Sequence, residues 1–76
     1  MLLIEFQDNS ANPVTVNAER ILLISPQGSE NTIIHFAALE HNIAAPYKEV
    51  KAKIEEAYAL QQRLSQQQHI GPSVVV

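Results

Sequence analysis

Apolar and polar residues alternate along the first half of the chain. In residues 2–7 every second side chain is apolar, which predicts a β-strand with one covered face. Residues 14–17 alternate again, and residues 18–20 interrupt the pattern as a bend, a bulge or a short turn would. Residues 21–25 resume the interrupted strand, and an apolar run at 32–37 predicts another strand after a turn that contains Pro, Gly and Asn.

A period of three to four residues begins after the strands. Pro46 suits the first position of a helix, where its missing N–H needs no partner. The apolar residues that follow form one stripe, at positions 47, 50, 54, 57 and 64, with Leu60 beside it. Helix-forming residues continue to about Gln68, and Gly71 and Pro72 predict the helix end.

These elements predict an α+β fold, a small antiparallel β-meander of three to four strands followed by one long C-terminal helix. Residues 40–44 are the optional fourth strand. A chain of 76 residues makes one domain, which we expect to span residues 1–70, with residues 71–76 as a tail.

A single helix covers only one face of such a sheet. The expected covered face consists of Leu2, Ile4, Phe6, Val14, Val16, Ile34 and Phe36. Leu3, Ile33 and alternate residues of the run 21–24 then point the other way. Burying an aliphatic side chain is worth about 1.5–3 kcal/mol, so an open patch of them is unfavourable. Either a second chain covers this face, or a sheet edge or the tail does.

The helix leads to the same expectation. A helix over residues 46–68 is about 34 Å long, whereas strands of five or six residues span about 17–20 Å. Leu60 and Leu64 are therefore expected beyond the sheet, where a second copy of the helix is the simplest partner. The candidate interface residues of a homodimer or larger homo-oligomer are Leu22, Ile24, Ile33, Leu60 and Leu64.

Composition narrows the classes of protein. The chain has no cysteine, so it forms no disulfide, and we expect a cytoplasmic protein without a membrane span. The net charge of −3 disfavours a dedicated nucleic-acid binder, whose affinity comes largely from phosphate neutralisation. On a helix Lys48 and Lys51 are neighbours, but Lys53 points away from both, so no basic stripe forms.

Catalytic chemistry is not indicated. The chain contains no phosphate-binding glycine loop, nucleophile elbow or zinc-protease motif, and its serines have no base at a recognisable spacing. We expect no enzyme, no cofactor and no metal. The alternative is a metal or small-ligand site in which His35 and His41 meet across a hairpin near Glu40.

The stretch VNAERILLISPQGSENTIIHF, followed by YKEVKAKIEEA, is similar to two small bacterial families. It resembles the first half of LytTR-type DNA-binding domains and the FlbD-like small flagellar regulatory proteins, over about residues 16–57. The resemblance implies a non-catalytic bacterial or phage accessory protein. The expected function is a protein–protein interaction or regulatory accessory module, and the alternatives are a DNA-binding regulator and the His35–His41 site.

Overall fold

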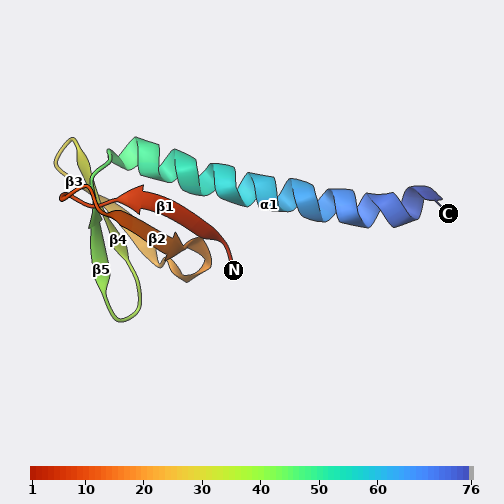
Figure 1. Ribbon diagram of the computed structural model, residues 1–76, viewed down its shortest axis with the longest axis horizontal. Helices are drawn as coiled ribbons and strands as arrows, with labels where there is room; N and C mark the ends of the chain where they lie inside the picture. Colours follow the sequence, from red (N-terminus) through yellow and green to blue (C-terminus); the bar gives the residue numbers. More distant parts are fainter. Residues whose placement is uncertain (76) are drawn as a thin grey trace.

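Five strands in two antiparallel sheets and one long helix make up the computed structural model, which describes the backbone of residues 1–75 and the side chains of residues 1–64 (Figure 1). One sheet pairs β1 with β2, and the other has the order β3-β4-β5. The elements are β1 (Leu3–Gln7), β2 (Pro13–Asn17), the 3-10 helix η1 (Ala18–Arg20), β3 (Leu23–Gln27), β4 (Asn31–His35), β5 (Glu40–Ile43) and α1 (Tyr47–Val75).

The α+β class is confirmed, but the strands are arranged differently from the single meander of three to four strands. The predicted interruption at residues 18–20 is η1, which separates two sheets. Asn17 fixes it, because its Oδ1 accepts from the backbone N–H of Glu19 at 3.2 Å and of Leu2 at 3.1 Å. A turn held in this way redirects the chain, so β3 starts a new sheet instead of continuing β2.

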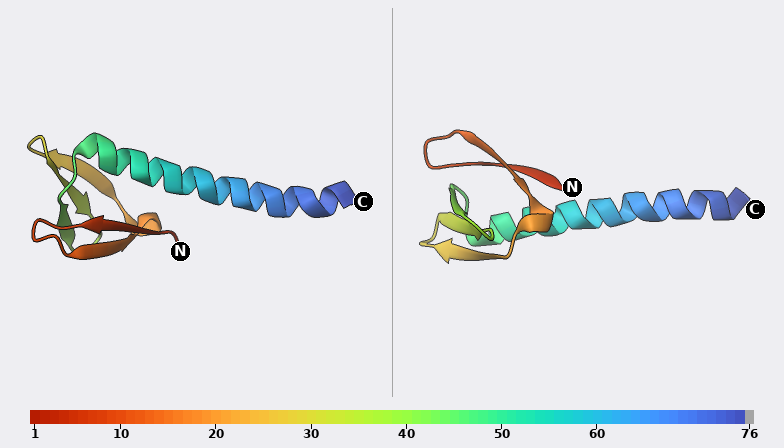
Figure 2. Two further views of the ribbon diagram at one scale, coloured as in Figure 1. Left: turned by 45° about the horizontal axis from the view of Figure 1, so that its top comes forward. Right: turned by 90° about the horizontal axis from the view of Figure 1, so that it is seen from below.

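The two sheets enclose the core together with α1. Figure 2 shows the β1–β2 hairpin lying across the other three strands, with the start of α1 beside them. A backbone hydrogen bond from Ala44 N–H to the Gln7 carbonyl, 2.8 Å long, links the two sheets. The buried apolar residues are Ile4, Phe6, Val16, Ala18, Ile34, Ile43 and Val50.

One polar side chain is fully buried among them. Thr32 lies in β4 beside Ile34, and its hydroxyl donates to the carbonyl of Ala45 at 2.8 Å. This bond satisfies a polar group that would be costly to bury alone, and it holds the segment that leads into α1 against the sheet.

The helix covers the core with the predicted stripe. Val50 is fully buried, Ile54 and Ala57 pack against the core, and the hydroxyl of Tyr58 donates to the Ala18 carbonyl at 3.2 Å. The predicted helix end at Gly71 and Pro72 is wrong, because α1 continues to Val75. A proline removes one backbone donor and weakens a helix without necessarily ending it. Within the described residues, no helix is long and apolar enough to cross a membrane.

Candidate binding surfaces

The outer face of the three-stranded sheet carries Ile33 and the 55% exposed Leu23, as the sequence predicted, but its other side chains are polar. Ile33 lies in its central row between Ser25 and Asn42, and the amide of Asn42 donates to the Gln27 side chain. Ile24 is opposite the buried Ile34 and packs against the core, so it lies on the inner face. The run 21–24 is therefore apolar because part of it is core.

A hydrogen-bonded chain of three side chains crosses this outer face. His35 lies directly opposite Glu40, with 3.2 Å between its Nδ1 and the Glu40 Oε2. Its Nε2 is 3.0 Å from the hydroxyl oxygen of Ser25 on β3. Glu40 was expected near His35 from the sequence, but Ser25 was not, because its contact depends on the strand register, which spacing along the chain does not give.

Serine, histidine and acid occur here in the order that nucleophilic catalysts use. Such catalysis also needs N–H donors aimed at a developing oxyanion, in a site that excludes water. The cluster lies on a sheet face, where β4 is paired on both sides, with β3 and with β5. The Glu40 side chain is 63% exposed, so the site does not exclude water. We therefore interpret the three residues as cross-strand contacts that stabilise the sheet.

The predicted meeting of His35 and His41 is wrong. Because His35 lies opposite Glu40, the next residue along β5 points to the other face of the sheet. There His41 packs edge-on against Phe36, with 6.1 Å between ring centroids. Within the part of the chain whose side chains are described, no three metal-binding residues gather.

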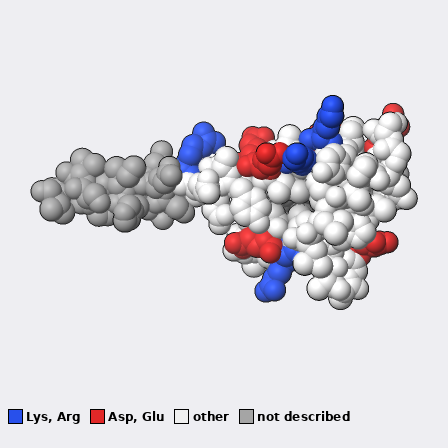
Figure 3. All heavy atoms as spheres, turned by 180° about the vertical axis from the view of Figure 1, so that it is seen from behind, with Lys and Arg blue, Asp and Glu red and all other residues white. Residues whose placement is uncertain are grey.

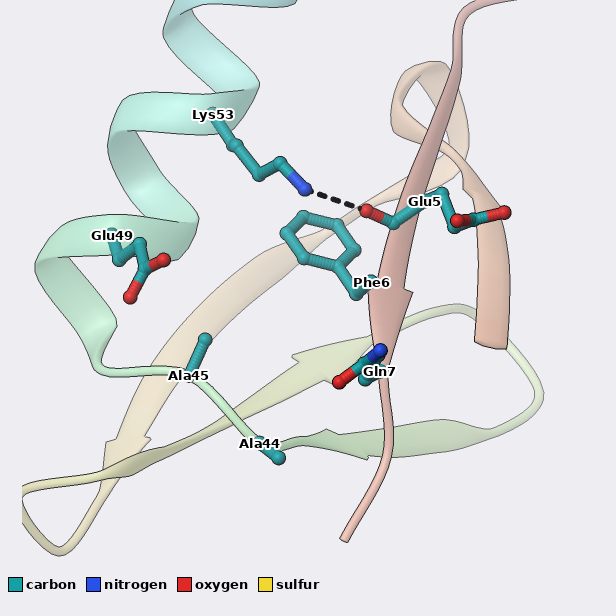
Figure 4. Close-up of a pocket in the computed structure, with 7 residues that line it drawn as sticks. All are labelled: Glu5, Phe6, Gln7, Ala44, Ala45, Glu49 and Lys53. Atoms are coloured by element: carbon teal, nitrogen blue, oxygen red, sulfur yellow. Dashed lines mark hydrogen bonds between the residues drawn. The ribbon is translucent and has the colours of Figure 1, made fainter. Parts of the chain in front are cut away.

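The open edge of β1 is covered from α1. Lys53 donates from its ammonium to the Glu5 carbonyl at 2.7 Å, and the same nitrogen lies 4.9 Å from the centre of the Phe6 ring (Figure 4). Glu49 lines the same hollow of about 260 Å³. The lysine thus occupies an edge carbonyl that another strand would otherwise use.

Further along the same edge, an apolar hollow of about 360 Å³ lies between β1 and α1. Leu3 and Leu60 line it and are 58% and 50% exposed, and Lys53 and Glu56 lie at its sides. Leu64, one helical turn after Leu60, is 52% exposed. Leu60 therefore lies beside β1 and not beyond the sheet as expected. We call Leu3, Leu60 and Leu64 the leucine surface.

A second apolar hollow, of about 430 Å³, lies on another side of the molecule. It runs between β2 and the turn that joins β4 to β5, and we call it the β2 groove. Its lining residues are Thr15, Val16, Asn17, Arg20, Phe36, Ala37, Ala38, Leu39 and His41.

The charged side chains do not form a single basic region on the face seen in Figure 3, where acidic and basic groups are interspersed. Glu19 pairs with the N-terminal ammonium at 2.9 Å. In the turn after β1, the backbone N–H groups of Asn12 and Ser10 donate to Asp8 and hold the pKa of its carboxyl below the usual value.

Of the predicted interface residues on the sheet, Leu22 is 67% exposed and Ile33 is half-buried.

Comparison with protein-family models, with curated proteins and with solved structures finds no match to this chain. The resemblance to the FlbD-like and LytTR-type families therefore stays a prediction.

Proposed function

We propose that this protein is a small, non-enzymatic protein-binding or regulatory accessory module that acts as a homo-oligomer, most simply a two-fold dimer. The observation that supports the proposal is the leucine surface. Leu3 and Leu60 line one hollow between β1 and α1, Leu64 follows one helical turn after Leu60, and each of the three residues is at least 50% exposed. Three clustered leucines in water are unfavourable, and pairing with a second copy buries them.

A two-fold interface must be complementary to itself, because the same patch contributes both sides. The hollow between β1 and α1 meets this requirement in two ways. Exposed leucines lie in it and next to it, at Leu60 and Leu64. It also carries both signs of charge, from Lys53 and from Glu5 and Glu56. A copy rotated by half a turn can place its leucines against this hollow.

The test is the mass of the protein in solution. Light scattering of the parent chain at tens of micromolar should give the mass of two chains or more. Leu60→Asp combined with Leu64→Asp should give a single-chain mass, because each carboxylate would have to be desolvated at the interface. Circular dichroism should show that the variant keeps its fold, since both side chains are already half exposed.

Leu22→Asp is the matched control, because Leu22 is even more exposed but lies before β3 on the other sheet. It should leave the mass unchanged. A parent chain that stays monomeric at high concentration would contradict the proposal. Dissociation by the Leu22 change alone would move the interface to the three-stranded sheet.

The alternative of a DNA-binding regulator receives less support from the side-chain contacts. Lys53, one of only three clustered lysines, already bonds the Glu5 carbonyl and covers the Phe6 ring. Phosphate contacts supply most of the affinity for duplex DNA, and they would have to come from a few separated cations.

A further inference from the structure

The edge of β2 that faces away from β1 carries backbone N–H and carbonyl groups that are not paired with another strand. The carbonyls of Glu5 and Gln7 point away from β2, since they accept from Lys53 and Ala44. Thr15, which lies opposite Glu5, therefore belongs to the pairs of an antiparallel ladder that bond outward. Its N–H and carbonyl face the open edge of β2. By the same alternation the N–H of Asn17 also faces this edge, whereas the Asn17 carbonyl lies at the start of η1 and accepts the first bond of that helix.

This edge forms one wall of the β2 groove. Thr15 and Asn17 both line the groove, so their outward backbone groups lie at its side. The opposite wall is the turn after β4, which contributes the half-buried Phe36 and the 55% exposed Leu39. A strand that bonds to Thr15 would place alternate side chains against this apolar wall.

One end of the groove is positively charged. Arg20 follows β2 by three residues and is an exposed lining residue. None of the nine lining residues is acidic, and Arg20 forms no ion pair among the side chains that the structure describes. Its neighbour Glu19 is engaged with the N-terminal ammonium. A carboxylate would complement this end of the groove.

We propose that the β2 groove binds an extended, apolar peptide segment of a partner protein, which adds a strand to β2 and places an acidic group beside Arg20. Strand addition draws affinity from main-chain hydrogen bonds and selectivity from alternate side chains, and the groove offers both. The inference rests on the proposed function of a protein-binding module, but it uses a surface separate from the leucine surface.

The probes are fluorescent hexapeptides of alternating valine and threonine with blocked ends. One carries glutamate at its C-terminal end, one at its N-terminal end, and matched peptides carry lysine instead. Fluorescence anisotropy should detect binding of one glutamate peptide, with the lysine counterpart at least about fivefold weaker. The glutamate position that binds gives the strand direction, because Arg20 lies at the C-terminal end of β2. Equal binding of glutamate and lysine peptides, or no binding of either, overturns the inference.

Two variants separate the contributions. Thr15→Pro removes the outward N–H without breaking a β1–β2 bond, as Pro13 already does opposite Gln7, and should weaken binding about tenfold. Arg20→Glu should reverse the preference toward the lysine peptide. Unchanged binding by a folded Thr15→Pro protein overturns strand addition. If that variant does not fold, a failure of Arg20→Glu to change the charge preference overturns the inference by itself.

The leucine-surface variant separates this inference from the proposed self-association. Leu60→Asp with Leu64→Asp should still bind the glutamate peptide, since neither residue lines the β2 groove. A parent protein that is monomeric but binds the peptide contradicts the homo-oligomer and supports the groove. A dimer that binds no glutamate peptide contradicts the groove and leaves the homo-oligomer in place.

Discussion

Two adjacent isoleucines of β4 have opposite environments. Ile34 is fully buried between the sheets, whereas Ile33 is half-buried on the outer face. Ile34→Ala should lower the free energy of unfolding by about 2–5 kcal/mol, because it leaves a cavity in a small core. Ile33→Ala should cost distinctly less, since its neighbours are polar and water replaces the lost atoms. Urea denaturation of both variants checks this, and equal losses would contradict the assigned faces.

Ala11 adopts a left-handed backbone conformation, with φ of +63°, in the turn between β1 and β2. For a residue with a Cβ this conformation costs about 1–2 kcal/mol, whereas for glycine it does not. Ala11→Gly should therefore raise the free energy of unfolding, by up to about 1 kcal/mol after the entropy of the unfolded chain is counted. Thermal denaturation measures the change, and a lower melting temperature would count against the assigned turn.

At the scale of residues, alternation predicted much of the core and missed its polar member. Ile4, Phe6, Val16 and Ile34 are buried as the pattern indicated. Thr32 is also fully buried, because the carbonyl of Ala45 satisfies its hydroxyl. A hydropathy pattern cannot reveal such a residue, since its burial depends on an acceptor 13 positions away.

Lys53 connects two elements, α1 and β1. Lys53→Met keeps most of the aliphatic stem but removes the bond to the Glu5 carbonyl and the charge above Phe6. We expect a loss of about 1–2 kcal/mol in the free energy of unfolding. Lys51→Met, on an exposed position of the same helix, should change it by less than about 0.5 kcal/mol. Chemical denaturation of both variants at equal protein concentration checks this, and equal effects would mean that the Lys53 contact contributes nothing.

The elements themselves were largely predictable, and their pairing was not. Apolar periodicity located the strands, the helix predicted to begin at Pro46 begins at Tyr47, and the interruption at residues 18–20 is η1. The division into two sheets depends on the Asn17 side chain and on long-range packing. For the same reason the contact of His35 with Ser25 became visible only with the register.

For the whole molecule, self-association predicts that stability depends on protein concentration. A dimer that forms only from folded chains is stabilised by mass action, so its melting temperature should rise as the concentration increases. Calorimetry over a hundredfold range of concentration measures the rise. The Leu60→Asp and Leu64→Asp variant should show no such rise. A parent melting temperature that is independent of concentration would contradict a dimer coupled to folding.

The sequence indicated surplus apolar surface but located it only in part. Leu60 and Leu64 are half exposed as anticipated, whereas Ile24 belongs to the core. The β2 groove was not predicted, because it is formed by β2 and a turn about 20 residues later in the chain. Which hydrophobic residues share a surface follows from how the two sheets pack, and local periodicity does not contain that information.

Strand pairing in this molecule has a consequence for the rate of folding. Every paired strand is joined to its partner by one short turn: β1 to β2, β3 to β4, and β4 to β5. Hairpins close quickly because little chain entropy is lost before their contacts form, and proteins with mostly local contacts fold fast. Docking of the β1–β2 hairpin against the three-stranded sheet through Ala44 and Gln7, with α1 packed over them, is the only step that joins distant parts of the described chain. We therefore expect this docking to limit the folding rate, with all three hairpins already formed.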